Sequence, residues 1–227
     1  MRRRAGPDEK ARAAAAAYRG DRPDVRRLVP PTARRVLDLG CSSGTVGAVL
    51  RRELGCEVVG VELDGAAAAV ARGRLDRVVE ADMEELLARP DHGLGEFDCL
   101  VAADSLEHLR DPWTALARAV ELLAPGGTAV VSLPNVRYFE TFWQLGVRGR
   151  WPRRESGVFD RTHLRWFTRR DARDLLEGAG LDVTAVKPQI RIRPFGSRFD
   201  PLFGPLARTP LREFLSLQYV LRGVRRR

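Results

Sequence analysis

Long apolar runs are absent from this chain of 227 residues. A helix that crosses a bilayer needs about 20 consecutive apolar residues, so the sequence predicts no membrane span. Cysteine is also scarce, with only Cys41, Cys56 and Cys99. Their number is odd and their spacing does not match a zinc site, which excludes a disulfide scaffold and a zinc module. We therefore expect a protein of the reducing cytoplasm.

A secretory leader is also not indicated. The N-terminal stretch MRRRAGPDEKARAAAAAYRGD contains an alanine run, but the run is short, follows charged residues and lacks an apolar core. We interpret residues 1–30 as a helical segment on the surface of the protein.

Acidic residues are outnumbered by basic ones, which gives a net charge of +9. Arginine triplets at residues 2–4 and 225–227 contribute at both ends of the chain. Such a charge is typical of proteins that bind nucleic acid, an anionic surface or an anionic substrate. No RNA-binding module or interleaved aromatic pattern accompanies it. Solvated arginines are therefore the simpler interpretation, and a nucleic-acid partner stays as an alternative.

The most informative stretch of the chain is VLDLGCSSGTVG, residues 36–47. An apolar run, two glycines at Gly40 and Gly44, and a following segment with helical spacing predict a buried strand, a tight turn and a helix start. Glycine allows positive φ and close approach of a ligand to the backbone. The N–H groups at the helix start favour an anionic or electron-rich ligand group.

A carboxylate follows at the end of a second predicted strand. Glu62 closes the segment EVVGVE and lies 22 residues beyond Gly40. A parallel neighbouring strand would carry Glu62 to the same sheet edge as the glycines, where a carboxylate can hold the two hydroxyls of a ribose. The glycines alone would fit an ordinary strand-to-helix turn. Together with the acid they favour a nucleoside site.

The spacing of the glycines distinguishes between nucleoside cofactors. Dinucleotide enzymes carry G-x-G-x-x-G after the first strand. Here the glycines stand at 40, 44 and 47, and Ser42 replaces the second glycine of that pattern. The Asp38 carboxylate would repel a pyrophosphate but attract a cation. S-adenosylmethionine carries an ammonium and a sulfonium and no phosphate, so it suits this site better than a dinucleotide.

Five motifs follow one another in the order VLDLGCSSG, VVGVELD, EADMEEL, FDCLVAADSLEHL and LLAPGGTAVVSLPN. In order and spacing they resemble class I S-adenosylmethionine-dependent methyltransferases. The later stretch GRWPRRESGVFDRTHLRWFTRRDARDLLEGAG resembles the branch related to ubiquinone O-methyltransferases, many of whose members act on sugars, polyketides and other small metabolites. The resemblance covers about residues 20 to 190. Ser42 departs from it, since many members have glycine there.

The alternation of strands and helices predicts an α/β fold with a doubly wound, mostly parallel sheet. The resemblance implies seven strands, a Rossmann-like methyltransferase fold and an antiparallel last strand. We expect strands at 35–39, 57–62, 77–80, 97–102, 128–133, 181–186 and 217–223, and helices at 45–54, 65–72, 84–89, 113–123 and 169–178. Asp111 with Pro112, and Thr168 with Asp171, have the form of helix N-caps.

The chain divides into four predicted parts: a helical segment at 1–30, a cofactor-binding core at 31–135, a lid at 136–167 inserted after strand 5, and the C-terminal part of the core at 168–227, with an acceptor-side loop at 195–213. The lid is rich in aromatic residues and arginine. Its aromatics at 138–151 would form either the lid core or an acceptor pocket.

The resemblance also implies roles for individual residues. Asp38, Gly40, Cys41 and Gly44 would shape the methionine end of the cofactor site. Glu62 and Leu63 would bind the ribose, Asp82 and Met83 would flank the adenine, and Asp104 would complete the site after the fourth strand. Asp82 has a second interpretation as the N-cap of the following helix.

The turn Asp104-Ser-Leu-Glu-His108 allows three interpretations. If it is helical, Asp104, Glu107 and His108 share one face. Some ubiquinone-type relatives use an acid, a Glu and a His at this spacing for a divalent metal. Otherwise His108 could act as general base with Glu107 orienting it, or the turn could simply support the cofactor loop. His163, in DRTHLR, would either fasten the lid or face the acceptor.

The sequence therefore predicts an S-adenosyl-L-methionine-dependent methyltransferase, with His108 and His163 as candidate catalytic residues and no metal assigned. We expect O-methylation of a small metabolite or of a glycan or polyketide intermediate. The alternatives are an RNA or protein methyltransferase and a non-catalytic partner protein that binds the same cofactor.

Overall fold

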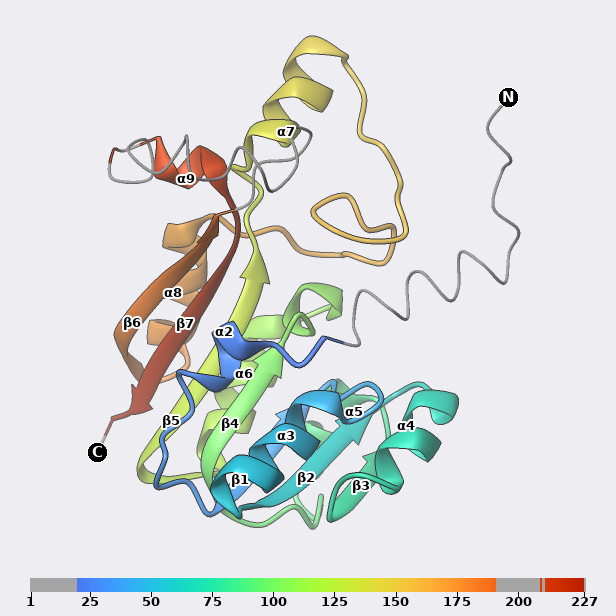
Figure 1. The fold of residues 1–227 in the computed structure, drawn as a ribbon, viewed down its shortest axis with the longest axis vertical. Coiled ribbons are helices and arrows are strands. Elements are labelled where there is room, and N and C mark those ends of the chain that lie inside the picture. The colour runs from blue at the N-terminus through green and yellow to red at the C-terminus, as the bar shows by residue number, and fades with distance from the viewer. Residues whose placement is uncertain (1–19, 191–208, 210, 227) are drawn as a thin grey trace.

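The computed structural model describes residues 20–190, 209 and 211–226. Its centre is one seven-stranded sheet with strand order β3-β2-β1-β4-β5-β7-β6 (Figure 1). The strands are β1 (Arg35–Leu39), β2 (Glu57–Glu62), β3 (Arg77–Glu80), β4 (Phe97–Ala103), β5 (Leu123–Pro134), β6 (Leu181–Ile190) and β7 (Ser216–Arg225). Strands β1 to β5 pair in parallel, and β7 pairs antiparallel with both β5 and β6. The predicted doubly wound fold with an antiparallel last strand is confirmed.

Helices connect the strands and cover both faces of the sheet (Figure 1). They are α2 (Pro23–Arg26), α3 (Thr45–Leu54), α4 (Gly65–Arg72), α5 (Met83–Ala88), α6 (Pro112–Glu121), α7 (Phe139–Thr141), α8 (Arg169–Gly178) and α9 (Arg212–Leu215), with a 3₁₀ turn η1 (Leu106–His108) and a π-helix η2 (Phe142–Val147).

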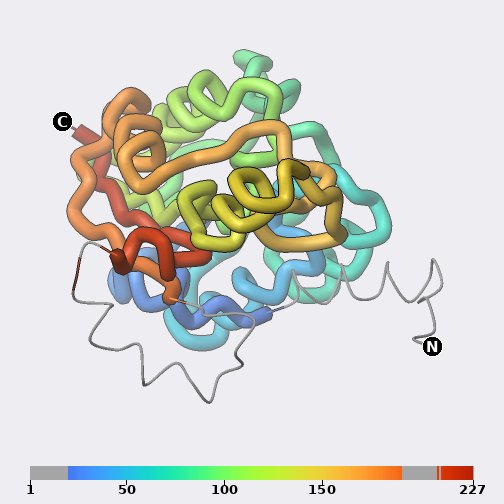
Figure 2. Tube along the Cα trace, turned by 90° about the horizontal axis from the view of Figure 1, so that it is seen from above, coloured from blue at the N-terminus to red at the C-terminus, as the bar shows by residue number. Residues whose placement is uncertain are grey.

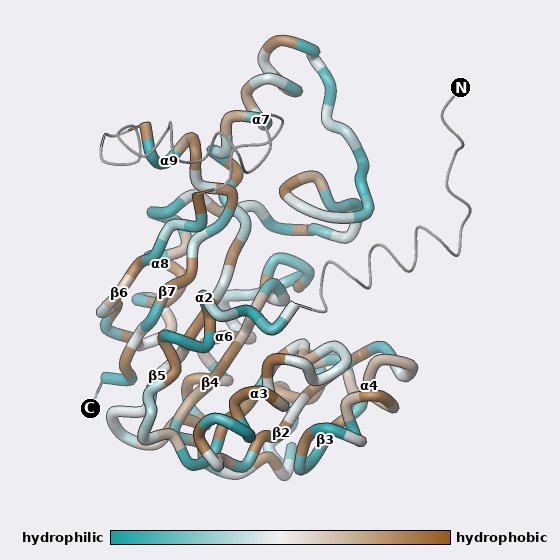
Figure 3. The backbone as a smooth tube through the Cα atoms, viewed as in Figure 1, coloured by the Kyte–Doolittle hydropathy of each residue, from teal (hydrophilic) through white to brown (hydrophobic). Residues whose placement is uncertain are grey.

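The core lies on both sides of the sheet. Successive strand residues point to opposite faces, and the neighbours Val36 and Leu37 accordingly belong to two separate clusters of buried side chains. Colouring by hydropathy shows the apolar segments running through the central strands (Figure 3). Burial on both faces explains why residues 99–103 of β4 form a continuous apolar run rather than an alternating one.

The predicted caps set the ends of two helices. Asp111 accepts a hydrogen bond from the Thr114 N–H at 3.1 Å at the start of α6. Thr168 and Asp171 form a complete capping box at the start of α8. Both predictions are confirmed.

Strand β5 differs from its prediction because it begins at Leu123 rather than at 128. Leu123 pairs with Phe97, and the register then shifts so that Cys99 pairs with Thr128. The Pro-Gly-Gly segment at 125–127 is therefore an irregularity within the strand and does not precede it. The Pro-Gly-Gly sequence does interrupt regular pairing, as expected of a turn, but the residues on either side of it, Leu123 and Thr128, both pair with β4.

The segment between β5 and α8 lies beyond the carboxyl ends of β4 and β5 (Figure 1). It contains α7 and η2, and from above it lies over the end of the sheet (Figure 2). Its base is closed by a bridge between Asn135 and Phe167. The buried Asn135 amide donates to the Ser216 carbonyl at 2.8 Å, which fastens this base to β7. The boundaries 136–167 of the lid stay a prediction.

The predicted helical segment at residues 1–30 is described only from residue 20, and most of the predicted loop at 195–213 also lies outside the described residues. Within the described part of the chain, no helix has the length and apolar character needed to cross a membrane. The three cysteines are buried and unbridged.

Candidate functional site

The turn after β1 depends on glycine at two places. Gly40 has φ of 73°, and a Cβ there would lie 2.7 Å from the Ser105 Cβ. In β2, a Cβ on Gly60 would lie 2.6 Å from the Cys41 Sγ. The N–H groups of Gly40 and Cys41 both donate to the Val61 carbonyl, at 2.9 and 3.1 Å. The glycine loop therefore bends over β2 and touches the turn after β4.

Ser42 takes a left-handed conformation with φ of 48°. That region favours glycine, the residue that many members of the resembled family carry here. The Ser42 N–H donates to Glu62 Oε2 at 2.7 Å. The left-handed backbone therefore turns one N–H of the loop toward the carboxylate.

Glu62 ends β2 beside this loop, as the parallel pairing of β1 with β2 requires. Its Oε1 accepts from the Asp64 N–H at 2.8 Å, so backbone donors fix both oxygens. A carboxylate oxygen has two acceptor sites, so each can accept a further hydroxyl. The next residue, Leu63, is 68% exposed at the same edge. The position is the one a ribose-binding acid needs.

Asp38, two residues before Gly40, is a buried carboxylate that is only 2% exposed. Its Oδ2 has no hydrogen-bond partner among the described residues. Burial raises the pKa of Asp38 to about 7, and the nearby Glu62 charge adds to the rise. A buried acid without a partner costs free energy unless a ligand completes it. A cation beside Oδ2 would do so, which fits S-adenosylmethionine.

A cavity of about 50 Å³ lies at this point and is bordered by Asp38, Gly40, Ser42 and Thr45. Across it, Arg22 pairs with Asp104 and donates to Ser132 Oγ at 2.8 Å. The cavity has an acid on one side and a guanidinium on the other.

Arg22 was not predicted as a site residue. It precedes α2 in a left-handed conformation with φ of 42°, and no local pattern marks it. Only the folding of the N-terminal segment across β4 and β5 brings it to the sheet edge. Its partner Asp104 also accepts from Ser132 Oγ at 2.8 Å and from the Gln218 amide. Burial raises the pKa of Asp104, and the Arg22 charge opposes that rise.

Asp82 and Met83 lie at the neighbouring strand end. Asp82 caps α5, because its Oδ1 accepts from the N–H groups of Glu84 and Glu85 at 2.8 and 3.3 Å. The N-cap interpretation is confirmed, and contact with adenine stays a prediction. The Met83 Cε would lie 3.5 Å from a Cβ on Gly40, so this side chain borders the glycine loop.

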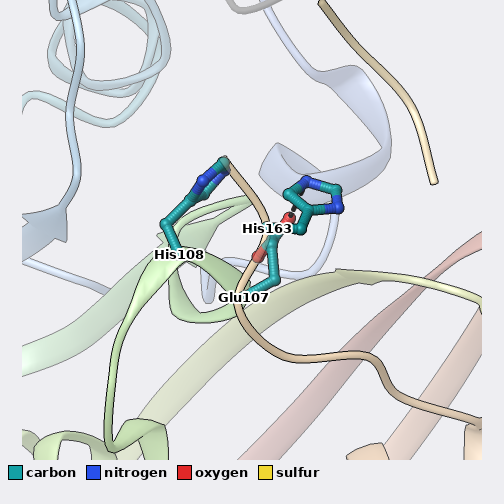
Figure 4. Close-up of side chains that lie close together, drawn as sticks. All are labelled: Glu107, His108 and His163. Atoms are coloured by element: carbon teal, nitrogen blue, oxygen red, sulfur yellow. Dashed lines mark ion pairs between the residues drawn. The ribbon is translucent and has the colours of Figure 1, made fainter. Parts of the chain in front are cut away.

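The turn after β4 does not bring Asp104, Glu107 and His108 together. Asp104 precedes η1 with φ of 55° and faces Arg22. Instead, the side chains of Glu107, His108 and His163 lie together (Figure 4). Each has an oxygen or nitrogen that could bind a metal ion, and these atoms lie within 4.8 Å of one another. The prediction that Asp104, Glu107 and His108 share one face of a helical turn is wrong, because Asp104 is not part of that turn.

Glu107 also does not orient His108. Neither of its carboxylate oxygens has a hydrogen-bond partner among the described residues, and Oε1 is 3.8 Å from His163 Nε2. Burial raises the pKa of Glu107 well above its usual value, and the Asp104 charge adds to this. Burial lowers the pKa of His163 to about 4, aided by His108. Both shifts favour the uncharged forms of the acid and of the imidazole.

His108 is instead held by the predicted lid. Its Nδ1 is 3.0 Å from Thr162 Oγ1 and 3.3 Å from the Thr162 carbonyl oxygen. Thr162 Oγ1 in turn donates to Asp160 Oδ1 at 2.6 Å. Sequence reasoning missed Thr162 and Asp160, although both lie in the same DRTHLR motif as His163. His163 is buried, so it fastens this segment as one of its two interpretations requires, and its catalytic role stays a prediction.

Comparison with known proteins identifies the family and the fold of the chain. Residues 9–186 match the model of a methyltransferase domain. The chain is 30% identical over 205 residues to a ubiquinone biosynthesis O-methyltransferase of Cereibacter sphaeroides, with 89% of this chain and 78% of that protein covered. In fold it is similar to a SAM-dependent methyltransferase from Archaeoglobus fulgidus, with TM-score 0.65, 18% identity and coverage of 95% and 94%. A magnesium protoporphyrin IX methyltransferase from Synechocystis with bound SAH gives TM-score 0.62, 14% identity and coverage of 99% and 90%.

Proposed function

Because the chain belongs to the methyltransferase-domain family and is an S-adenosylmethionine-dependent methyltransferase, we propose that it methylates a hydroxyl oxygen of a small acceptor, a phenol or a sugar. The relatives named as ubiquinone biosynthesis O-methyltransferases support oxygen as the acceptor atom. Bound S-adenosylmethionine supplies an electrophilic methyl group on a sulfonium.

The observation that supports cofactor binding in this proposal is the unpartnered Asp38 carboxylate beside Arg22 and Glu62 at one sheet edge. In the proposed complex Asp38 becomes ionised against the cofactor ammonium. Arg22 meets the cofactor carboxylate, exchanging part of its pairing with Asp104. Opposite charges at both ends of a small cavity select a zwitterionic amino acid head over a phosphate.

The remaining predicted cofactor-binding residues surround the other parts of S-adenosylmethionine. Gly40 and Cys41 border the cavity proposed for the methionine part, Gly44 ends the same loop, and Glu62 with the exposed Leu63 receives the ribose. Asp82 and Met83 flank the adenine while Asp82 keeps its capping role.

His108 is the proposed base for the acceptor proton. It is less buried than His163 and lies on the turn that touches Gly40 through Ser105. A positioned base contributes typically about 10²–10⁴-fold to a proton transfer.

The net charge of +9 keeps an RNA or protein acceptor as the second candidate. Within the described residues many arginines already pair with acids, for example Arg26 with Glu53 and Arg51 with Asp76. These acids reduce the local positive charge that an RNA would meet, which favours the small acceptor. We place the reaction in the cytoplasm.

The experiment is incubation of the purified protein with S-adenosylmethionine labelled in the methyl group and a panel of phenols, catechols, sugars and total RNA. We expect label in a phenol or sugar, with a rate that depends little on salt. Label in RNA, with binding that weakens steeply as salt rises, would overturn the small-molecule assignment. Cofactor binding without transfer to any acceptor or extract would favour a non-catalytic partner protein. A matched run with EDTA tests the metal alternative, and we expect no change in rate.

A further inference from the structure

The hydrogen bonds around His108 define which of its ring nitrogens carries a proton. Nδ1 faces two oxygens of Thr162, the hydroxyl at 3.0 Å and the carbonyl at 3.3 Å. A carbonyl oxygen can only accept. The Thr162 hydroxyl has one hydrogen, and it donates that hydrogen to Asp160 Oδ1 at 2.6 Å. Both oxygens that face Nδ1 therefore accept, so Nδ1 must donate.

We propose that Thr162 and Asp160 are positioning residues that hold neutral His108 in its Nδ1–H tautomer, so that Nε2 is the nitrogen that takes the acceptor proton. This rests on the proposed function. The acceptor hydroxyl gives its proton to Nε2 while its oxygen bonds to the methyl carbon. The methyl–sulfur bond breaks and its electron pair stays on sulfur. The imidazolium then returns the proton to water.

The charge of Asp160 suits this role. In the imidazolium, Nδ1–H still donates to Thr162, and the chain of two hydrogen bonds ends on a carboxylate that is only 6% exposed. The buried Asp160 carboxylate therefore stabilises the imidazolium of His108, from which it is separated by the Thr162 hydroxyl. Asp160 also accepts from the Thr162 N–H at 2.9 Å, so the acid fixes both the backbone and the hydroxyl of Thr162.

The same segment is fastened to the turn that carries His108. The N–H groups of Leu164 and Arg165 donate to the Glu107 carbonyl at 2.9 and 3.1 Å. The His163 ring packs against the His108 ring with a centroid distance of 4.8 Å (Figure 4). The oxygens that select the tautomer thus belong to the segment inserted after β5, whereas the base belongs to the sheet edge. His108 is held in the Nδ1–H tautomer only when that segment lies against the turn after β4.

The chain provides its own reference for a direct measurement, because it contains three histidines. His92 Nδ1 accepts from the Leu94 N–H at 3.2 Å, which requires the opposite tautomer, Nε2–H. Long-range ¹H–¹⁵N spectra of ring-labelled protein, at a pH where imidazoles are neutral, distinguish the two forms. His108→Gln assigns the His108 signals. We expect Nδ1–H for His108 and Nε2–H for His92, and Nε2–H at His108 in the wild type would overturn the proposal.

Two matched variants separate positioning from folding. Thr162→Val removes the hydroxyl with little change of shape, and Thr162→Ser restores it. We expect the Nδ1–H population at His108 to fall in Thr162→Val and to recover in Thr162→Ser, with His92 unchanged in both. An unchanged His108 population in a folded Thr162→Val protein would show that the hydroxyl does not select the tautomer.

Turnover gives the second readout, with the acceptor found in the labelling panel and a series of phenols of increasing acidity. We expect Thr162→Val to lower kcat about 10- to 100-fold, since general-base contributions are about 10²–10⁴-fold and only orientation is lost. Cofactor Kd should stay unchanged, and the penalty should shrink as the phenol becomes more acidic. A penalty equal for all phenols would overturn the role of Nε2 as base. Failure of all methyl transfer would refute the proposed function, while the tautomer spectra would still decide the positioning of His108.

Discussion

Asp38 and Glu107 are both buried carboxyl groups with unpartnered oxygens, yet their surroundings differ. Asp38 borders a cavity of about 50 Å³ that also reaches Arg22. Glu107 is 0% exposed and is covered by His163, whose side chain is 3% exposed. Burial raises the pKa of both acids.

The comparison shows that an unsatisfied buried acid has two physical outcomes. Where a ligand can enter, the acid can ionise against a cation of the ligand. Binding then relieves the free-energy cost of burying the acid without a partner, and this relief adds to the affinity. Where no ligand can enter, the acid keeps its proton and acts as a neutral packing group. We expect the first outcome for Asp38 and the second for Glu107. Substitution by the uncharged amide should therefore separate them.

Asp38→Asn should give the largest effect. The amide keeps the shape but cannot pair with an ammonium, so we expect S-adenosylmethionine Kd to rise by about 10- to 150-fold, the range for a hydrogen bond to a charged group of about 1.5–3 kcal/mol. Calorimetry checks this. In the wild type below pH 7, binding should also release a proton from Asp38, seen as a binding heat that depends on the buffer. Asp38→Asn should lose that dependence, and a wild type without it would contradict the ionisation of Asp38 on binding.

Asp38→Asn weakens cofactor binding, but near neutral pH it should stabilise the fold of the unliganded protein relative to the wild type. The folded pKa of Asp38 is raised from 3.8 to about 7, so the native state holds this proton longer than the unfolded chain. The contribution of Asp38 to stability is therefore highest below about pH 4 and falls as pH rises to 7, by on the order of 4 kcal/mol. Urea unfolding without cofactor should show a smaller loss between pH 4.5 and 7 in Asp38→Asn. Parallel pH profiles would show that Asp38 is already ionised without ligand.

Arg22→Ala should give the next largest effect on the same site. It removes the guanidinium from the cavity that Asp38 borders, and we expect cofactor Kd to rise by about 10-fold or more. Arg22→Lys keeps the charge but loses the fork geometry, so it should recover only part of the affinity. Calorimetry with both variants checks this, and a Kd equal to that of the wild type in Arg22→Ala would remove Arg22 from the site.

Glu107→Gln should leave function nearly intact. The amide imitates the neutral acid, so we expect cofactor Kd and turnover within about 3-fold of the wild type, a difference below about 1 kcal/mol. Because the folded pKa of Glu107 is raised, its contribution to stability falls as pH rises. Glu107→Gln should therefore unfold at higher urea than the wild type at alkaline pH. A large loss of turnover with intact cofactor binding would show that the carboxylate itself takes part, as a metal ligand or as a base.

Ser42→Gly should give the smallest effect. It relieves the left-handed strain at φ of 48°, which costs roughly 1–2 kcal/mol, but it adds flexibility to the unfolded chain worth about 0.5–1 kcal/mol. We expect a stabilisation of at most about 1 kcal/mol, measured by urea unfolding, with cofactor Kd unchanged. Destabilisation would show that the serine side chain compensates for its backbone.

The β1–β2 half of the site could be predicted from sequence because its determinants are local. Two strands, a glycine turn and an acid at the next strand end lie within residues 35–62, and parallel pairing fixes their relative position. The same reasoning failed for η1, since left-handed Asp104 breaks the helical turn before it starts. No periodicity indicates a single residue of positive φ outside glycine.

The partners of these groups could not be predicted because they are distant in sequence. Arg22 is 82 residues from Asp104, and Thr162 is 54 residues from His108. Such pairs depend on how the N-terminal segment and the segment between β5 and α8 fold back over the sheet edge. The family resemblance included DRTHLR, but within this motif only the buried His163 was predicted as a site residue, not Thr162 or Asp160.

The burial of Cys41, Cys56 and Cys99 has a practical consequence. Burial raises the pKa of all three thiols, so none is a good target for maleimide reagents in the folded protein. A single cysteine introduced at the exposed position of Trp143 in η2 could therefore carry a fluorophore without removal of any native thiol. The dye would report optically on the segment after β5 each time a ligand arrives.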